Sequence, residues 1–374
     1  MEKKSLYIHI PFCAQKCLYC DFASFAGKEI FMDRYIEALS RELNFYKKYT
    51  FKTVYIGGGT PTFLNIKNLE KLGESISKLQ LTEDVEFSVE GNPGTFTTEK
   101  LEVIKGMGAN RLSIGLQSCN DRLLKSLGRI HSYKDFEKSF ELARNVGFKN
   151  INVDLMFGLP NQSFDDVKDT LSKVTYLEPE HISAYSLIVE ENTPFYSMYG
   201  DGKDLPNEED ERKMYYYILD YLNKKKYYQY EVSNFAKTKK ECIHNLVYWN
   251  LDDYIGCGLN AHSFLDGYRI ENISSMKAYI ENIEKGYLPI ENKHKNSTKD
   301  SMEEFMFMGL RKIKGISKKD FLERFNISME EVYYNVIKKY EQRALLINDT
   351  DFLRLSNKGI EVSNIIMSDF LLES

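Results

Sequence analysis

The sequence predicts an α/β protein whose main domain is a partial barrel of six β/α units. Short runs of β-branched and aromatic residues, typical of strands, recur at residues 5–12, 53–59, 85–92, 111–118, 151–160 and 181–190. Amphipathic helical patterns separate most of these runs, and successive strands begin 26 to 48 residues apart. Connections of that length need crossover segments, so we expect a parallel sheet with right-handed crossovers.

The ends of the predicted strands favour a partial (β/α)6 TIM-like barrel over a doubly wound open sheet, which fits the spacing equally well. Almost every strand passes at its carboxyl end from apolar residues to glycine or to a polar residue. These strand-end residues are Cys13, Gly57, Gly58, Gly59, Thr60, Glu90, Gln117 and Asp154. In parallel barrels the carboxyl-terminal rim holds the cofactors and the chemistry, so we expect a functional site there.

Two of the helices between the strands are well defined by their patterns. Within residues 31–48, apolar side chains fall at steps of three and four, and charged side chains take the other face. The helix predicted at 163–177 has Ser163 as its N-cap, with Asp165 and Asp166 in its first turn.

After about residue 200 the β/α pattern ends. We expect a barrel at residues 1–230, a connecting segment at 231–295 and a C-terminal, mostly helical domain at 296–374. The pattern further predicts a helix at 213–225, an edge strand within 228–236 and a solvated loop at 292–300. A small β-wing at 344–356 gives the last domain a winged-helix-like character.

Composition and charge weigh against several classes of protein. The net charge is −5, whereas proteins that bind nucleic-acid phosphates usually show a basic balance. No stretch approaches the roughly 18 to 20 apolar residues of a membrane span. The first apolar run stops at Pro11, unlike the core of a signal peptide. We therefore expect a cytoplasmic protein with no membrane span and no nucleic-acid partner.

Three of the six cysteines, Cys13, Cys17 and Cys20, lie in the stretch YIHIPFCAQKCLYCDF with the spacing Cys-x3-Cys-x2-Cys. Clustered cysteines in a reducing cytoplasm bind metals or act in catalysis more often than they form disulfides. Their clustering on one turn argues against three core residues, and a zinc site lacks its fourth ligand. An iron–sulfur cluster with one open iron accounts best for the odd number. The other three cysteines are scattered, and we expect them to be buried.

The sequence GGGTP at 57–61 and four polar residues near strand ends are further candidates. A tight turn explains one or two glycines, but three allow a ligand to approach the backbone, with N–H groups free to bind it. The polar residues occupy matching points of successive β/α units: Glu90, Gln117, Arg129 and Asp154. Each alone could equally be a salt-bridge or cap residue. Together they suggest a pocket, because carboxylates suit ammonium or hydroxyl groups and arginine suits a carboxylate.

Cys-x3-Cys-x2-Cys after the first strand, GGGTP after the second and a partial β/α barrel together resemble the radical S-adenosylmethionine family. The resemblance implies a [4Fe–4S] cluster on Cys13, Cys17 and Cys20, with the methionine part of S-adenosylmethionine on the fourth iron. It also implies that the glycine motif contacts the methionyl amino group. The implied S-adenosylmethionine pocket consists of Tyr7, Tyr19, Phe22, Gly58, Gly59, Thr60, Glu90, Gln117, Arg129 and Asp154.

A closer similarity is to the group of oxygen-independent coproporphyrinogen III oxidases and their haem-chaperone relatives. It rests on YIHIPFC, GGGTPT, RLSIGLQS, LGRIHS, DLMFGLP and EEFMFMGLR. Three departures favour the chaperones. The oxidases have a fourth cysteine where this chain has Phe22, and they carry an arm of several tens of residues before the cluster, which here begins at residue 13. HNLVYW at 244–249 also matches the HNxxYW motif that marks the chaperones.

The HNxxYW motif implies a haem site formed by His244, Asn245, Tyr248 and Trp249. Histidine is a common axial ligand of haem iron, and tyrosine and tryptophan offer flat apolar surface to a porphyrin. Without the resemblance, these residues alone favour an aromatic surface loop with a capped histidine.

The resemblance thus implies a haem chaperone, related to porphyrin biosynthesis, that passes haem to acceptor haemoproteins such as respiratory cytochromes. The cluster and S-adenosylmethionine would form a structural or regulatory element that supports a homodimer, and a peripheral membrane partner is compatible with this role. The alternative is an enzyme in which a 5′-deoxyadenosyl radical starts the oxidative decarboxylation of coproporphyrinogen III. A zinc-binding or nucleic-acid-binding winged-helix protein is a third interpretation, which the acidic balance and GGGTP disfavour.

Overall fold

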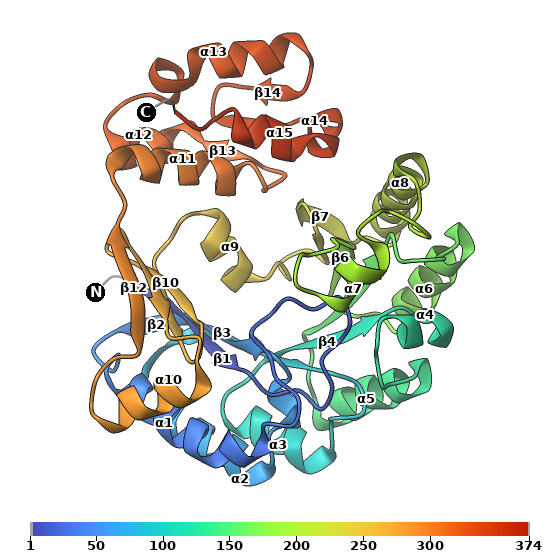
Figure 1. The fold of residues 1–374 in the computed structure, drawn as a ribbon. Coiled ribbons are helices and arrows are strands. Elements are labelled where there is room, and N and C mark those ends of the chain that lie inside the picture. The colour runs from blue at the N-terminus through green and yellow to red at the C-terminus, as the bar shows by residue number, and fades with distance from the viewer. Residues whose placement is uncertain (1–2, 373–374) are drawn as a thin grey trace.

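A computed structural model describes residues 3–372 and has a curved twelve-stranded sheet at its centre (Figure 1). Six parallel strands follow one another in chain order: β1 (Lys4–Ile10), β2 (Thr50–Gly58), β3 (Gln80–Gly91), β4 (Arg111–Gln117), β5 (Ile151–Phe157) and β6 (His181–Ser186). The six expected strands are confirmed. A doubly wound sheet reverses its strand order at a switch point, and this one does not, so the partial barrel is confirmed as well.

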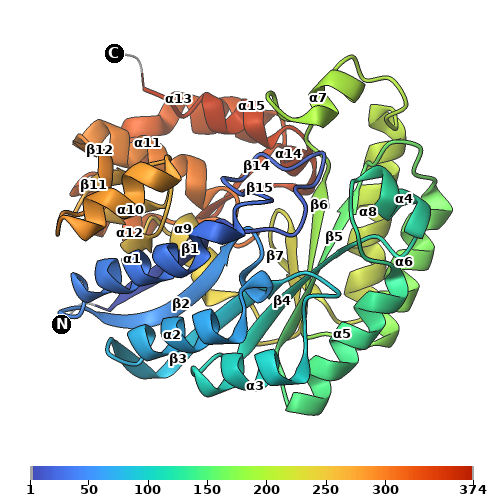
Figure 2. The same ribbon diagram turned by 60° about the horizontal axis from the view of Figure 1, so that its bottom comes forward.

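The helices between these strands lie along the outer side of the curved sheet (Figure 2). They are α1 (Met32–Asn44), α2 (Ile66–Ile76), α3 (Thr98–Gly106), α4 (Asp121–Ser126), α5 (Tyr133–Val146) and α6 (Phe164–Tyr176). Strand residues that alternate toward them form the main core, in which Leu6, Ile8 and Ile10 of β1 are fully buried. Ser163 caps α6 as expected, in a reciprocal pair of hydrogen bonds with Asp166.

Further strands extend the sheet at both edges. Beyond β6 lies the hairpin of β8 (Asn234–Ala236) and β7 (Tyr228–Glu231), which follows α7 (Pro194–Tyr199) and α8 (Glu208–Lys224) in the chain. Beyond β1 lie the parallel β9 (Tyr254–Cys257) and the antiparallel β10 (His262–Leu265), β11 (Tyr268–Asn272) and β12 (Ile290–Lys295). The short helices α9 (Ile243–Trp249) and α10 (Met276–Glu284) occupy the connections.

The structure differs from expectation at three places in this region. The edge strand predicted within 228–236 is a hairpin, because a turn at 232–233 divides it into two short strands. The prediction of a loop at 292–300 is wrong. This segment contains the end of β12, whose side chains are exposed at the sheet edge, and the start of the next helix. Helix α8 begins at Glu208, earlier than predicted, because Asn207 caps it and acidic residues suit a first turn.

The C-terminal residues, at the top of Figure 1, fold around a second core, to which Leu251 and Phe264 also contribute. The helices are α11 (Thr298–Gly309), α12 (Lys318–Phe325), α13 (Met329–Gln342), α14 (Asn357–Glu361) and α15 (Ser363–Ser368). A three-stranded sheet of β13 (Ile316–Ser317), β15 (Phe352–Leu355) and β14 (Leu346–Asn348) accompanies them, which confirms the β-wing. The domain boundaries near 230 and 296 stay a proposal.

Within residues 3–372, no helix combines the length and the apolar character that a membrane crossing requires. The three scattered cysteines are buried, as expected: Cys119 is 5% exposed, and Cys242 and Cys257 are fully covered.

A buried carboxyl group ties α1 to the strands added beside β1. Glu42 is fully buried and accepts hydrogen bonds from the Gly258 N–H (2.8 Å), the Asn272 side-chain amide (2.7 Å) and the Tyr279 hydroxyl (2.5 Å). Burial raises the pKa of Glu42 from 4.5 to about 7, and the three hydrogen bonds act in the opposite direction.

We expect this carboxyl group to make stability depend on pH. The folded state holds the proton more tightly than the unfolded chain, so the contribution is fully present below pH 4.5 and is lost as the pH rises to about 7. The loss amounts to as much as about 3 kcal/mol. Denaturant unfolding between pH 4.5 and 7.5 should show a shallower slope for Glu42→Gln than for the wild type. Replacement of the exposed Glu70 by glutamine is the control, and an unchanged slope in Glu42→Gln would contradict the assignment.

Candidate cluster and ligand site

The interior of the barrel is lined by polar side chains. The strand register places the inward-facing residues in rows, which run from the amino to the carboxyl ends of the strands. The rows are Ser5, Thr53 and Glu86; then Tyr7, Tyr55, Ser88 and Arg111; then His9, Gly57, Glu90, Ser113, Asn152 and His181; and then Gly115, Asp154 and Ser183. Barrels with packed interiors fill these positions with large branched apolar residues, so this lumen is suited to a ligand.

A cavity of about 400 Å³ occupies the lumen and opens at the carboxyl-terminal rim. Twelve of the residues predicted for the site line it: Cys13, Cys17, Tyr19, Cys20, Phe22, Gly58, Gly59, Glu90, Gln117, Arg129, Asp154 and Asn245. Five predicted residues do not: Tyr7, Thr60, His244, Tyr248 and Trp249. The structure thus brings together the cysteine loop and the strand-end residues, and it places most of the HNxxYW motif outside the cavity wall.

The loop that carries the three cysteines is fixed mainly by hydrogen bonds of its backbone. The N–H of Cys13 donates to the carbonyl of Phe25 (3.0 Å), and the Phe25 N–H donates to the carbonyl of Pro11 (2.8 Å). His9 bonds through Nε2 to the carbonyl of Ala23 (2.9 Å) and through Nδ1 to the Tyr7 hydroxyl (3.0 Å). Tyr7 therefore stabilises the cysteine loop indirectly, through its hydrogen bond to His9.

A polynuclear cluster and a single metal ion make different demands on the three thiols. In the described part of the chain, no three His, Cys, Asp or Glu side chains lie close enough to share one ion. A [4Fe–4S] cluster places each thiolate on a different iron, so its ligands need not converge on one point. Thr60 also serves this loop, because its hydroxyl donates to the Cys13 sulfur at 3.4 Å. Burial raises the pKa of the Cys13 and Cys20 thiols.

The glycine motif has a different role from the one expected. Its N–H groups are already used: Gly58 donates to Glu90 (3.1 Å), Gly59 to the carbonyl of Ile10 (2.8 Å) and Thr60 to the carbonyl of Phe12 (2.8 Å). A Cβ atom at Gly58, whose φ is +107°, would lie 2.4 Å from the His9 ring. The expectation of free N–H donors is therefore wrong: the glycines allow β1, β2 and the cysteine loop to approach one another.

The polar residues at the strand ends are held in fixed orientations. Glu90 accepts hydrogen bonds from the Tyr55 hydroxyl (2.7 Å) and from Gly58, and burial raises its pKa to about 7. Asp154 accepts from Ser113 (2.9 Å) and Asn152 (2.7 Å). Both carboxyl groups face the cavity, where they suit hydroxyl or ammonium groups of a ligand.

Arg129 and Gln117 also line the cavity near the carboxyl ends of the strands. Arg129 donates through Nη1 to Asn92 (2.8 Å) and through Nη2 to the Tyr19 hydroxyl (2.8 Å), and its buried Nε has no partner. Gln117 has a left-handed φ of 72° at the irregular end of β4. Such backbone strain in a residue other than glycine often accompanies a functional site.

The HNxxYW motif forms helix α9 at the opposite end of the lumen from the cysteine loop. His244 is 1% exposed; Nδ1 bonds to the Thr53 hydroxyl (2.8 Å), Nε2 bonds to the Tyr248 hydroxyl (2.9 Å), and the ring stacks on Tyr55. Burial lowers the pKa of His244 to about 3, so the ring is neutral. The alternative of an aromatic surface loop is therefore wrong, and in this conformation His244 offers no free nitrogen to an iron.

Glu86 of β3 anchors the amino end of α9. Its carboxylate accepts the N–H groups of Ile243 (3.0 Å) and His244 (2.9 Å), which are unpaired donors at a helix start. At the other end of the helix, the Arg311 guanidinium lies 5.2 Å from the Trp249 ring. Asn245 is the member of the motif that reaches the cavity.

Several cavity residues were missed from the sequence, among them Tyr55, Arg111, Asn152, Ser183 and Tyr185. The signal that could have found them is strand alternation. In RLSIGLQ, Leu and Ile alternate with polar or small residues, so the second set must face the lumen once the first faces the helices.

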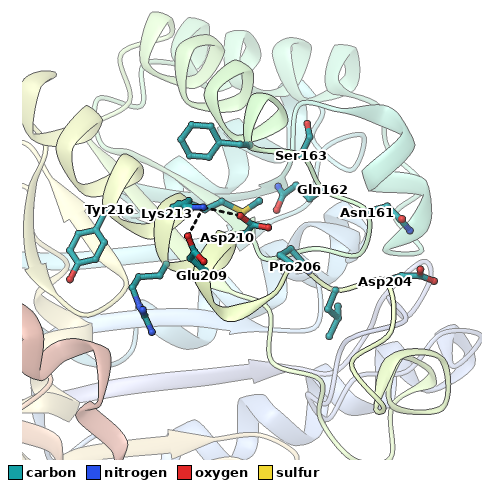
Figure 3. A pocket seen from close by; sticks show the side chains of 13 residues that line it. Asn161, Gln162, Ser163, Asp204, Pro206, Glu209, Asp210, Lys213 and Tyr216 are labelled. Atoms are coloured by element: carbon teal, nitrogen blue, oxygen red, sulfur yellow. Dashed lines mark hydrogen bonds and ion pairs between the residues drawn. The ribbon is translucent and has the colours of Figure 1, made fainter.

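A second cavity, of about 680 Å³, lies where residues at the start of α6 approach the first turns of α8 (Figure 3). None of the predicted site residues lines it. The Lys213 ammonium there is already paired with Glu209 (2.9 Å) and Asp210 (3.4 Å), as the dashed lines show. Although this cavity is larger, the chemistry-bearing side chains converge in the lumen, which is therefore the candidate site.

Known families match both parts of the chain. The pattern of the Radical SAM superfamily matches residues 7–174, and that of the HemN C-terminal domain matches residues 296–362. The solved structure of coproporphyrinogen III oxidase (HemN) from Escherichia coli, a radical SAM enzyme, covers 99% of this chain and 90% of its own at a TM-score of 0.86. With 21% identity, that likeness shows the fold alone. The fold, the cysteine loop and the matching family pattern place this chain in the class of radical S-adenosylmethionine proteins.

Curated relatives narrow the class. Proteins named Heme chaperone HemW are 41% identical in Bacillus subtilis, over 99% of this chain and 100% of the relative, and 38% identical in Lactococcus lactis, over 100% and 98%. The relative of that name in Escherichia coli is 34% identical over 99% of this chain and 98% of its own length. This chain belongs to the HemW family.

The anchoring of α9 can be tested at Glu86. Glutamine keeps one acceptor oxygen, so Glu86→Gln leaves one of the two N–H groups without a good partner. We expect a loss of about 1–3 kcal/mol in the free energy of unfolding, since the bonds are charge-assisted. We also expect Trp249, the single tryptophan, to emit at longer wavelength as α9 loosens. Glu83→Gln, at an exposed position of β3, is the matched control. Unchanged stability and emission in Glu86→Gln would show that this carboxylate does not hold the helix.

Proposed function

We propose that this protein binds haem and transfers it to acceptor haemoproteins, and that it carries a [4Fe–4S] cluster and S-adenosylmethionine. The observation that carries the proposal is the lumen cavity, whose polar interior opens at an apolar mouth. Phe22 (65% exposed), Ile188 (69%) and Tyr185 (39%) line that mouth. Large apolar side chains gathered in the open at one cavity commonly mark a binding site. Haem combines an apolar ring, which suits the mouth of the cavity, with two carboxylates, which suit its polar interior.

Cys13, Cys17 and Cys20 are the residues that would hold the cluster. When bound, a [4Fe–4S] cluster supplies one-electron chemistry and an open iron for the methionine part of S-adenosylmethionine. The hydrogen bonds of His9 and Thr60 fix the loop before any ligand arrives. Phe22 stands at the mouth, where the resembled oxidases have a cysteine, and it offers a porphyrin an apolar face in place of a fourth thiol.

The strand-end residues would form the S-adenosylmethionine pocket. Glu90 and Asp154 offer acceptors to hydroxyl and ammonium groups, and the free Nε of Arg129 offers a donor to a carboxylate. Since the N–H groups of the glycine motif are occupied, its carbonyl oxygens are the groups left to meet a methionyl ammonium. Tyr7 acts indirectly in this proposal, through His9 and the cysteine loop.

The HNxxYW motif supports the cavity from its floor. His244, Tyr248 and Trp249 pack and orient α9, and Asn245 faces the ligand. Direct coordination of haem iron by His244 would require the helix to leave Thr53 and Tyr248, so we assign this residue a positioning role.

The acceptors in this proposal are haemoproteins such as respiratory cytochromes, and the setting is the cytoplasm. A homodimer and a peripheral membrane partner remain part of the proposal. The second candidate function, oxidation of coproporphyrinogen III, draws on the fold shared with HemN. The full-length similarity to proteins named heme chaperones favours haem transfer over it.

The two functions can be separated by one pair of assays on protein with an anaerobically reconstituted cluster. We expect haem to give a saturable Soret band, since the mouth and lumen suit the porphyrin. Incubation with coproporphyrinogen III, S-adenosylmethionine and a reductant should yield no protoporphyrinogen. Turnover to protoporphyrinogen, or the absence of any saturable haem binding, would overturn the chaperone proposal.

The cluster ligands are tested by iron and sulfide content after reconstitution. We expect Cys17→Ala to lose most of both, because one iron loses its thiolate. Cys119→Ala is the matched control: this cysteine is buried after the end of β4, where it contacts Thr170 of α6, and its loss should leave the content unchanged. Equal content in Cys17→Ala and in the wild type would remove this cysteine from the ligand set.

A further inference from the structure

Arg111 lies inside the barrel, and its guanidinium has few hydrogen-bond partners in the described structure. It is the first residue of β4, it is 1% exposed, and its side chain lines the lumen cavity in the row above Glu86. Among the described residues, its only hydrogen bond runs from Nη1 to the Ser88 hydroxyl at 3.5 Å, and its buried Nε has no partner.

The nearest carboxylates are committed elsewhere. Glu86 uses both of its oxygens on the N–H groups at the start of α9, and Glu90 accepts from the Tyr55 hydroxyl and the Gly58 N–H. Neither forms an ion pair with Arg111 in the described structure. A guanidinium taken out of water without hydrogen-bond partners is costly, so a fold retains one where a ligand completes it.

We propose that Arg111 binds a carboxylate of the ligand that occupies the lumen cavity, with Asn245 as its neighbour in the cavity wall. The planar fork of a guanidinium matches a carboxylate through two parallel N–H···O bonds, which a lysine cannot reproduce. The rest of its row consists of Tyr7, Tyr55 and Ser88, and the charges of Glu86 and Glu90 in the neighbouring rows attract the guanidinium without a hydrogen bond to it.

Two carboxylates could meet Arg111, and this inference rests on the proposed function for the first of them. One is a propionate of haem, and the other is the methionyl carboxylate of S-adenosylmethionine. The propionate is favoured by position: Arg129 lies beside the cysteine loop, where S-adenosylmethionine is expected, whereas Arg111 lies deeper, toward the α9 end of the lumen.

The test compares Arg111→Met and Arg111→Lys with the wild type and with Arg41→Met, a control at an exposed arginine on α1. Protein with a reconstituted cluster is titrated with haem and with haem dimethyl ester, whose propionates are blocked. S-adenosylmethionine binding is measured separately by equilibrium dialysis. Thermal unfolding of each variant reports whether it folds.

We expect Arg111→Met to bind haem roughly tenfold more weakly than the wild type, with Arg111→Lys in between. The dimethyl ester should bind the wild type and Arg111→Met alike. Weaker S-adenosylmethionine binding with unchanged haem binding would equally support the carboxylate site and would assign it to the methionyl group. Unchanged affinity for both ligands would overturn the inference.

The outcome also separates this inference from the proposed function. A wild type that binds no haem removes the haem-transfer proposal, and the S-adenosylmethionine measurement alone then decides the role of Arg111. Should Arg111→Met fail to fold, Arg111→Lys decides by the same comparison, since equal binding of both ligands by that variant overturns a bidentate site.

Discussion

Polar side chains buried inside a barrel must find partners, either in the protein or in a ligand, and this constraint organises the structure. Most polar side chains in the lumen find these partners within the protein. Asn152 connects Asp154 to His181, and His181 in turn reaches the Tyr230 hydroxyl at 2.9 Å. Among the described residues, Ser5 in the first row keeps an unpartnered hydroxyl, and two arginines that line the cavity, Arg111 and Arg129, each keep a buried Nε without a partner. A fully satisfied lumen would be a structural core, whereas this one is incomplete where a ligand would lie.

Helix α9 joins this lumen to the C-terminal domain (Figure 1). On the barrel side it is held by Thr53, Tyr55 and Glu86. On the other side, Lys312 donates to Asn250 at the end of the helix (2.6 Å), and Arg324 donates to the carbonyl of Leu251 (2.8 Å). The HNxxYW motif, which distinguishes the chaperones in the sequence, thus forms a helix between the lumen and the C-terminal domain. The helix contacts the barrel on one side, and the residues at its end contact the C-terminal domain on the other.

The sequence predicted the carboxyl-terminal half of the site well and the other half poorly. Cys13, Glu90, Gln117 and Asp154 interrupt apolar strands at their ends, so a parallel sheet had to bring them to one rim. Arg111, the first residue of its strand, was not among the predicted site residues, because only the register reveals which residues share a row. The residues alone favoured a surface loop around His244, because a seven-residue helix packed on both sides shows too little periodicity to be recognised.

The central claim is that haem occupies the lumen between the cysteine loop and α9. The most direct test is a crystal structure with cobalt protoporphyrin in place of haem, with anomalous data at the cobalt edge, which distinguish the porphyrin metal from cluster iron. The account predicts one cobalt peak within the barrel, with the ring at Phe22 and Tyr185 and a propionate directed toward Arg111. A cobalt peak on the outer surface of α9, or against the C-terminal helices, would contradict it.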